Sequence, residues 1–350
     1  MKIRKQPGYS FDDVLLVPKY SAITSRSDVD LSTTLGKLKL KLPLLSSNMD
    51  TVTEGDMAVA MGEAGGAGVL HRFASGSSIV DWLRVCDNVP KIMSVGINAA
   101  PFFQGADLMV TCDELAVDAI CVDVAHGDHN LVFATVQSIR SLLPNMDIIA
   151  GNVATGEGAM RLVEAGANII KVGIGPGSVC STRVVSGHGV PQLTAILDVC
   201  NELAHLRIPG RKEVSIIADG GIRYPGDVVK SLAAGADAVM LGSLLAGTDE
   251  AAGERIVEHG QAYKTFRGMA SREAQKQKRQ DRTPRVEGVS AKVPYLGPVR
   301  GVLDNLEAGI RSGFSYSGAN DLAELHKVAE FIVVTGNTLK ESHPHHPYRL

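Results

Sequence analysis

The chain has 350 residues, of which 45% are hydrophobic and 21% are charged, and its formal net charge is −3. This composition indicates a soluble globular protein with a large core, and the small negative charge argues against a general affinity for nucleic acids. The N-terminal residues lack the apolar segment of a secretory signal, and no apolar run reaches the ~18 residues of a membrane span. The five cysteines are widely spaced without a C-x-x-C pair, which predicts a cytoplasmic protein without a disulfide framework or a structural zinc site.

Eight short apolar stretches alternate with helix-like segments in the first two thirds of the chain. Each is almost continuously hydrophobic, a pattern typical of parallel strands that are covered on both faces. In chain order they are LPLLSS (42–47), AGVLHR (67–72), KIMSVGIN (91–98), DAICVDVA (118–125), DIIAGNVA (147–154), NIIKVGIG (168–175), VSIIADGG (214–221) and AVMLGS (238–243).

A signal recurs between several of these stretches: a helix-like segment ends in Ala-Gly-Ala or a close variant, and a strand follows. EAGGAGVL, EAGANIIKVG and AAGADAVMLG are three copies. We expect each of these glycines to be the C′ residue of a helix in left-handed geometry. Eight such units predict an α/β protein with a (β/α)8 TIM barrel, because an open doubly wound sheet needs a reversal of strand order that this pattern does not indicate.

We expect one catalytic domain over residues 1–350, with two irregular segments. Residues 268–292 are polar and weakly periodic, as in a mobile flap, and residues 338–350 form a C-terminal tail. Barrel enzymes place their active sites at the C-terminal ends of the strands, so the residues that follow each predicted strand are the candidates for chemistry.

The loops after the seventh and eighth strands are glycine-rich and lie where barrels often bind phosphate. Gly220, Gly221, Gly242 and Ser243 can offer backbone N–H groups to an anion there, although tight turns alone would also explain them. Asp219 precedes the first of these loops. Its carboxylate can accept hydrogen bonds from both hydroxyls of a ribose, or it can simply cap a helix.

The stretch GIGPGSVCSTR (173–183) places Cys180 on a glycine-rich loop after the sixth strand. This loop offers a cysteine little apolar packing, and a nearby Arg183 with the loop N–H groups can favour a thiolate, so we interpret Cys180 as a nucleophile. Cys121 and Cys200 are interpreted as small core residues. Thr182 is placed to relay a proton. Glu287 in the flap can act as acid or base when the flap closes, or can be a solvated loop residue.

The chain resembles the IMP dehydrogenase and GMP reductase family over nearly its whole length. The motifs that carry the resemblance are GIGPGSVCSTR, SSNMDTVTE (46–54), VDVAHG (122–127), AGNVATG (150–156), IADGGI (217–222) and VMLGSLLAG (239–247). The resemblance implies a barrel that forms homotetramers, binds GMP or IMP, and passes through a covalent bond between a cysteine and the purine.

The same resemblance implies a role for individual residues. Cys180 would attack C2 of the purine, and Thr182 and Glu287 would be the acid/base pair. The substrate would contact Ser47, Met49, Asn152, Ser178, Asp219, Gly221, Gly242, Ser243, Gly268 and Met269. The nicotinamide cofactor would contact Asp123, Ala125 and Arg282. Carbonyl groups of Gly175, Gly177 and Cys180 would bind a monovalent cation, K⁺, with Glu341 of a neighbouring subunit.

Sequence features point to both reactions of the family. The chain has no room near residues 75–90 for the regulatory domain pair of most dehydrogenases. Thr283 follows Arg282, where dehydrogenases carry an Arg-Tyr pair that activates water. The tail TLKESHPHH (338–346) favours a dehydrogenase, but Phe266 replaces a phosphate-binding tyrosine of those enzymes. We expect NADPH-dependent reductive deamination of GMP to IMP and ammonia, with NAD-dependent oxidation of IMP to XMP as the alternative.

Two other classes share parts of this pattern. An FMN-dependent barrel oxidoreductase uses the same phosphate loops, but it would be yellow and would have no use for Cys180. A nucleotide-binding protein without catalysis is also compatible with the scaffold, because a fold does not determine a function.

Overall fold

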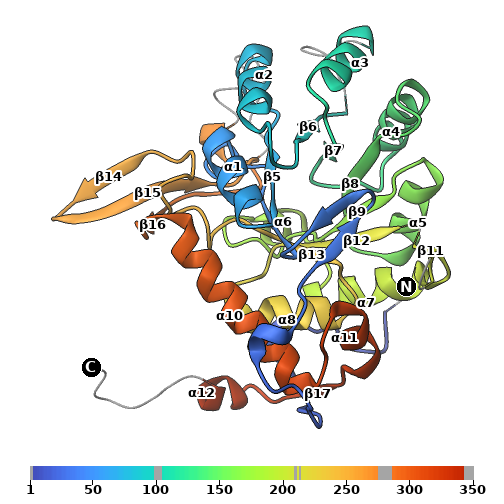
Figure 1. The fold of residues 1–350 in the computed structure, drawn as a ribbon, viewed down its shortest axis with the longest axis vertical. Helices are drawn as coiled ribbons and strands as arrows, with labels where there is room; N and C mark the ends of the chain where they lie inside the picture. The colour runs from blue at the N-terminus through green and yellow to red at the C-terminus, as the bar shows by residue number, and fades with distance from the viewer. Residues whose placement is uncertain (1–2, 98–104, 209–210, 213, 275–285, 343–350) are drawn as a thin grey trace.

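The computed structural model describes residues 3–97, 105–208, 211–212, 214–274 and 286–342. Its centre is a closed barrel with the strand order β12-β13-β4-β5-β6-β7-β8-β9 (Figure 1). All neighbouring strands of the barrel are parallel. Its strands are β4 (Leu44–Ser46), β5 (Ala67–Leu70), β6 (Ile92–Val95), β7 (Ala119–Asp123), β8 (Asp147–Val153), β9 (Ile169–Val172), β12 (Ser215–Asp219) and β13 (Ala238–Leu241). Each lies inside one of the eight predicted stretches, so the (β/α)8 barrel is confirmed.

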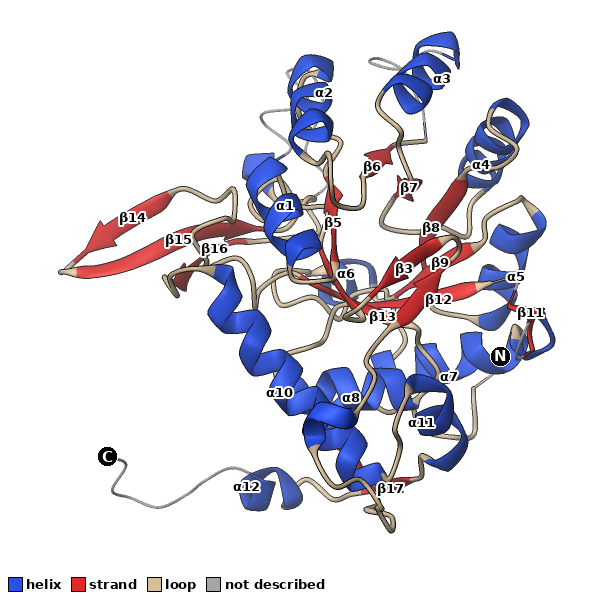
Figure 2. Cartoon of the chain, viewed as in Figure 1, coloured by secondary structure: helices blue, strands red, loops and turns tan. Residues whose placement is uncertain are grey.

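Helices surround the barrel and connect its strands (Figure 2). They are α1 (Gly55–Glu63), α2 (Gly76–Val85), α3 (Gly105–Glu114), α4 (Asn130–Leu142), α5 (Gly156–Glu164), α6 (Thr182–Ser186), α7 (Gln192–Glu202) and α8 (Pro225–Ala233), followed by α10 (Val299–Ser317), α11 (Leu322–Val328) and α12 (Thr338–Ser342). Gly65, Gly166 and Gly235 follow the C-cap residues of α1, α5 and α8, with φ of 93°, 112° and 106°. The predicted left-handed C′ glycines are therefore confirmed. None of the helices among the described residues is long and apolar enough to cross a membrane.

A hairpin closes the N-terminal end of the barrel. It consists of β2 (Thr33–Leu35) and β3 (Leu38–Leu40), whose leucines belong to the same buried cluster as the inward-facing residues of the barrel strands. The turn is held by hydrogen bonds from the Gly36 and Lys37 amides to Ser215 and Asp147, the first residues of β12 and β8. With this end filled, the opposite end of the barrel is the one available to a ligand.

A second sheet projects from the barrel and was not predicted (Figure 1). It contains β14 (Arg255–Glu258), β15 (Gln261–Arg267) and β16 (Ser290–Pro294) in antiparallel order. Residues 290–292, which the sequence placed at the end of the flap, pair with β15. The end of the predicted flap is thereby part of this sheet.

Short pairings far apart in the sequence complete the fold. The strand β1 (Val14–Leu16) pairs antiparallel with β17 (Phe331–Val333), so a segment from the beginning of the chain lies beside one near its end. A two-residue pair, β10 (Arg207–Ile208) with β11 (Arg211–Lys212), follows α7. These strands are too short to have a clear sequence pattern.

Helix α10 packs against α8, and a substitution of one of its buried residues tests this packing. Phe314 on this helix is completely buried, whereas Tyr316 on the same helix is 63% exposed. Phe314→Ala is expected to lower the free energy of unfolding by about 3–5 kcal/mol, since it leaves a cavity in a close-packed interior. Tyr316→Ala is the matched control and is expected to change it by less than about 0.5 kcal/mol. Denaturant unfolding measures both, and equal losses for the two variants would contradict this packing.

Candidate active site

A cavity of about 470 Å³ opens at the C-terminal ends of the barrel strands. Its volume lies in the range of ~300–1,000 Å³ that is typical of small-molecule sites. The following predicted residues line it together: Ser47, Met49, Asp123, Ala125, Asn152, Gly175, Gly177, Ser178, Cys180, Thr182, Asp219, Gly221, Gly242, Ser243, Gly268, Met269 and Glu287. Two predicted residues are not among them. Arg282 lies outside the described residues, and Glu341 is exposed on α12, away from the barrel opening of the same chain (Figure 1).

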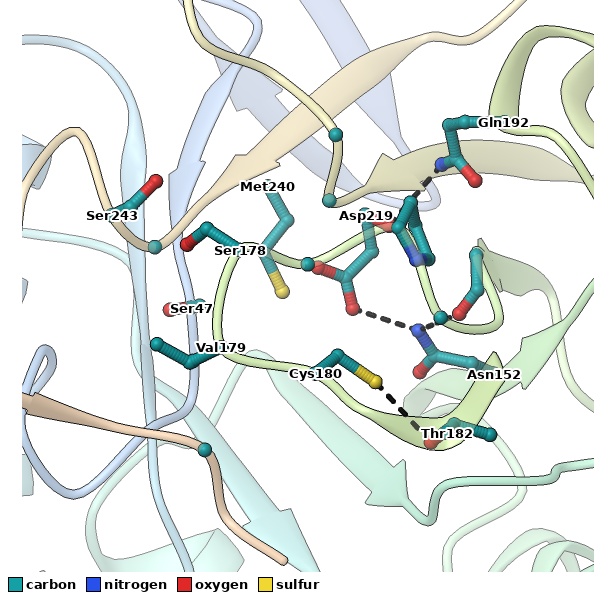
Figure 3. A pocket seen from close by; sticks show the side chains of 18 of the residues that line it. Ser47, Asn152, Ser178, Val179, Cys180, Thr182, Gln192, Asp219, Met240 and Ser243 are labelled. Carbon is teal, nitrogen blue, oxygen red and sulfur yellow. Dashed lines mark hydrogen bonds between the residues drawn. The ribbon is translucent and has the colours of Figure 1, made fainter. Parts of the chain in front are cut away.

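The loop after β9 carries Cys180 into this cavity (Figure 3). Its path requires glycine at position 173, where φ is 149° and an added Cβ would lie 2.1 Å from the Asp219 carbonyl oxygen. The guanidinium of Arg183 donates hydrogen bonds to the carbonyl oxygens of Ile174 and Val190. The structure therefore uses Arg183 to brace the loop that presents Cys180.

Cys180 is connected to a carboxylate through one hydroxyl. Its Sγ lies 3.2 Å from Oγ1 of Thr182, which donates a hydrogen bond of 2.9 Å to Oε2 of Glu287. The thiol proton thus has a path to the carboxylate through Thr182 (the link between Cys180 and Thr182 is drawn in Figure 3). A thiol that is linked through a hydroxyl to a carboxylate is an arrangement that can activate a nucleophile.

Backbone contacts hold Glu287 in place, although it lies more than a hundred residues after Cys180. The Ser181 amide donates to the Glu287 carbonyl oxygen, and the Glu287 amide donates to that of Ala270. Gly288 forms β-bridges with both Cys180 and Ser271. The start of the predicted flap, its end and the cysteine loop are therefore joined in one backbone arrangement.

The cysteines differ in their exposure and in the pKa of their thiols. Cys180 is exposed, whereas Cys121 lies completely buried on β7, and burial raises the pKa of the Cys121 thiol to about 12. Burial likewise raises the pKa of Cys112 to about 11. The core position expected for Cys121 is confirmed, but Cys200 is only half-buried on α7. Thiols with a raised pKa are poor nucleophiles, which argues against Cys112 and Cys121. Cys180 is the candidate because it lines the cavity and contacts Thr182.

A polar cluster occupies the floor of the cavity. The Asn152 side-chain amide donates hydrogen bonds of 2.8 Å to Oδ2 of Asp219 and to the Gly173 carbonyl oxygen. The ammonium of Lys171 lies 3.1 Å from Oδ1 of Asp123 and 2.9 Å from Oδ2 of Asp219. Burial of Asp123 raises its pKa, but the Lys171 ammonium and the Asn48 amide outweigh this and hold the pKa below its usual value. Asp123 therefore faces the cavity as an anion.

The glycine-rich loops form the other end of the cavity. Gly220 and Gly221 have φ of 90° and 83°, which favours glycine, and their backbone faces the opening beside Pro176. Ser47 is 5% exposed, and its Oγ has no hydrogen-bond partner in the described structure. Because buried hydroxyls are normally satisfied, this atom indicates a polar ligand group at this end.

Lys171 is a site residue that the sequence reasoning missed. It is the only charged residue of the apolar strand NIIKVGIG, on a strand expected to be covered on both faces. A lone lysine in such a strand needs buried partners of opposite charge. That signal could have identified it.

Comparisons with known proteins agree on one family. The model of the family described as "IMP dehydrogenase / GMP reductase domain" matches residues 8–345. Inosine-5'-monophosphate dehydrogenase of Borreliella burgdorferi is 35% identical, with 98% of this chain and 98% of the relative covered. The enzymes of the same name from Bacillus subtilis and Cryptosporidium parvum are 36% and 38% identical, each with 97% of this chain and 95% of the relative covered.

Proposed function

Because the chain belongs to the IMP dehydrogenase and GMP reductase family, we propose that it is an IMP dehydrogenase, which oxidises IMP to XMP with NAD. The observation that carries the chemistry is the chain of contacts from Cys180 through Thr182 to Glu287. The direction of the reaction is supported by the relatives, which carry the name inosine-5'-monophosphate dehydrogenase.

The protein's own residues perform the proposed reaction in two stages. Glu287 accepts the Cys180 thiol proton through Thr182, and the thiolate forms a bond to C2 of the hypoxanthine ring. A bound nicotinamide supplies the acceptor for the hydride that leaves C2, which yields a thioimidate between the purine and Cys180. Glu287 then releases the thiol proton to solvent. Water adds at C2 and gives a proton to Glu287 through Thr182, and this proton returns to the Cys180 sulfur as its bond to C2 breaks and XMP is released. One IMP, one NAD⁺ and one water thus give XMP, NADH and a proton.

The nucleotide would lie across the cavity with its base at Cys180. Asp219 would accept hydrogen bonds from the ribose hydroxyls, with its carboxylate oriented by Asn152. The backbone of Gly221 and Gly242 and the hydroxyls of Ser178 and Ser243 would bind the phosphate. The buried, unpartnered Ser47 Oγ at the same end fits this placement.

The nicotinamide would occupy the side of the cavity lined by Asp123 and Ala125. The residues fit the group, since Asp123 is an anion that is 18% exposed and can accept a hydrogen bond from a carboxamide. A monovalent cation such as K⁺ would bind to carbonyl oxygens of Gly175, Gly177 and Cys180. Their loop fits it in part, because an added Cβ on Gly177 would meet only the Cβ of Cys180, at 3.6 Å, which leaves this turn open. Glu341 would reach that site only from a neighbouring subunit of a homotetramer.

The reduction of GMP, which was expected from the sequence, has weaker support than the oxidation of IMP. This expectation rests mainly on Thr283 after Arg282, a pair that lies outside the described residues, and also on the lack of room near residues 75–90 for a regulatory domain pair. The relatives that cover nearly the whole chain bear the name of the dehydrogenase. GMP reductase is retained as the second candidate because the sequence lacks a tyrosine after Arg282.

A two-arm assay tests the proposed function. Purified protein receives IMP with NAD in one arm and GMP with NADPH in the other, and the absorbance of the reduced nicotinamide is followed. We expect NADH to form in the first arm and NADPH to persist in the second. Consumption of NADPH with GMP, and no reaction with IMP, would replace the proposal with the second candidate.

A further inference from the structure

Lys171 is one of the largest fully buried side chains among the described residues, and it points into the barrel beneath the candidate active site. Only 2% of its side chain is exposed. Transfer of an ammonium into a protein interior costs several kcal/mol unless its partners compensate. An apolar side chain would fill the same space in a barrel strand without that cost, so the charge calls for an explanation.

The ammonium has a partner for each of its three protons. They go to Oδ1 of Asp123 on β7, Oδ2 of Asp219 on β12 and Oδ1 of Asn152 on β8. Lys171 itself is on β9, so one charge joins four barrel strands. Gly151 allows this approach, because an added Cβ would lie 2.5 Å from the Lys171 carbonyl oxygen and 2.7 Å from its Cβ.

The two carboxylates that share this ammonium face different parts of the cavity. Asp219 lies at the glycine-rich end with Gly220 and Gly221, and Asp123 lies beside Val124 and Ala125. They are 20% and 18% exposed, so each presents part of its carboxylate to a ligand. Other charged or titratable groups that act on this cluster are Cys121, on the same strand as Asp123, and Arg72 from the segment after β5.

We propose that Lys171 is the positioning residue that links the two halves of the cavity. Its ammonium holds Asp219 in place for the ribose of the nucleotide and Asp123 in place for the nicotinamide, and it compensates the repulsion between them. A single uncharged substitution therefore weakens both ligands at once, through the two carboxylates that Lys171 holds. The assignment of ligands to the two ends rests on the proposed function.

The test compares Lys171→Met with two variants that each affect one end. Asp219→Asn is expected to raise mainly the KM for the nucleotide, and Asp123→Asn mainly the KM for the nicotinamide cofactor. Lys171→Met is expected to raise both by at least ~10-fold, because both carboxylates lose a charge-assisted hydrogen bond. Lys171→Arg keeps the charge and is expected to recover most of the loss in both KM values.

For Lys171→Met the proposal also predicts a pH dependence of the KM for the cofactor, which a packing defect would not produce. Without the ammonium the pKa of Asp123 rises, so the KM for the cofactor is expected to increase as the pH falls toward about 6. Lys91→Met is the matched control. Lys91 is 8% exposed at the opposite end of the barrel, beside Asp87, and its loss can affect stability without affecting either KM.

The outcomes separate the failure of this inference from that of the proposed function. The assays use whichever mononucleotide turns over in the two-arm experiment, and calorimetry measures binding of that nucleotide alone. A protein that binds neither IMP nor GMP contradicts the proposed function. Normal KM values in folded Lys171→Met contradict the role of Lys171 alone. If Lys171→Met does not fold, Lys171→Arg is compared with the unmodified protein instead. Raised KM values for both ligands in folded Lys171→Arg would then contradict the role of the Lys171 charge.

Discussion

Cys180→Ser is expected to lower kcat for IMP oxidation by at least ~10³-fold and to leave nucleotide affinity within about twofold. A serine keeps the shape of the side chain and the contact with Thr182, but its hydroxyl is a far weaker nucleophile than a thiolate. In the proposed function, binding depends on the Asp219 cluster and the glycine-rich loops, which the substitution leaves unchanged. Steady-state assays with IMP and NAD, together with calorimetry of IMP binding, measure the two quantities.

Cys200→Ser is the control for this experiment. Cys200 is half-buried on α7 and does not line the cavity, so its kcat is expected to stay within about twofold of the unmodified protein. Full activity of Cys180→Ser would remove the basis for a covalent mechanism. A non-catalytic nucleotide-binding protein would show no activity in any of these variants.

Glu287→Gln is expected to lower kcat by about 10²–10⁴-fold, the usual contribution of a general acid or base. The glutamine keeps the backbone hydrogen bonds with Ser181 and Ala270 and can still accept from the Thr182 hydroxyl. It cannot take up the thiol proton, so the chemical step suffers while the KM for IMP changes little. Stopped-flow measurement of NADH formation in the first turnover follows that step directly.

A double variant tests whether Thr182 and Glu287 act together. If Thr182 and Glu287 act as one unit, Thr182→Val combined with Glu287→Gln will cost little more than either change alone. Glu273→Gln is the matched control, because Glu273 accepts a hydrogen bond from Ser290, the first residue of β16, and does not line the cavity. Losses that multiply in the double variant would show that the two residues act independently.

The barrel could be predicted because each of its strands is a local, almost continuous apolar run, and three of its helices end in a glycine that must be left-handed. The projecting sheet could not. Residues 290–294 are largely exposed, and their strand exists through pairing with β15. The pairing of β1 with β17 likewise joins residues 14–16 to residues 331–333, and no local pattern specifies such a contact.

The candidate site likewise has parts that the sequence predicts and parts that depend on contacts between distant segments. Cys180, Asp219 and the glycine-rich loops could be placed together from the sequence, because parallel barrel strands end at one edge. The distance between Thr182 and Glu287 could not, since it depends on how the segment before β16 folds back onto the cysteine loop. The lone charge of Lys171 is visible in its apolar strand, but its partners are not, because they lie on three other strands.

The most direct test of the account is a search for the bond between Cys180 and the purine. The protein is mixed with IMP and NAD, quenched in acid within the first turnover and digested, and the peptide that contains Cys180 is analysed by mass spectrometry. We expect a fraction of this peptide to carry the nucleotide when both ligands are present, and none when NAD is omitted or in Cys180→Ser. Formation of NADH with only unmodified Cys180 peptide at every quench time would contradict the covalent mechanism.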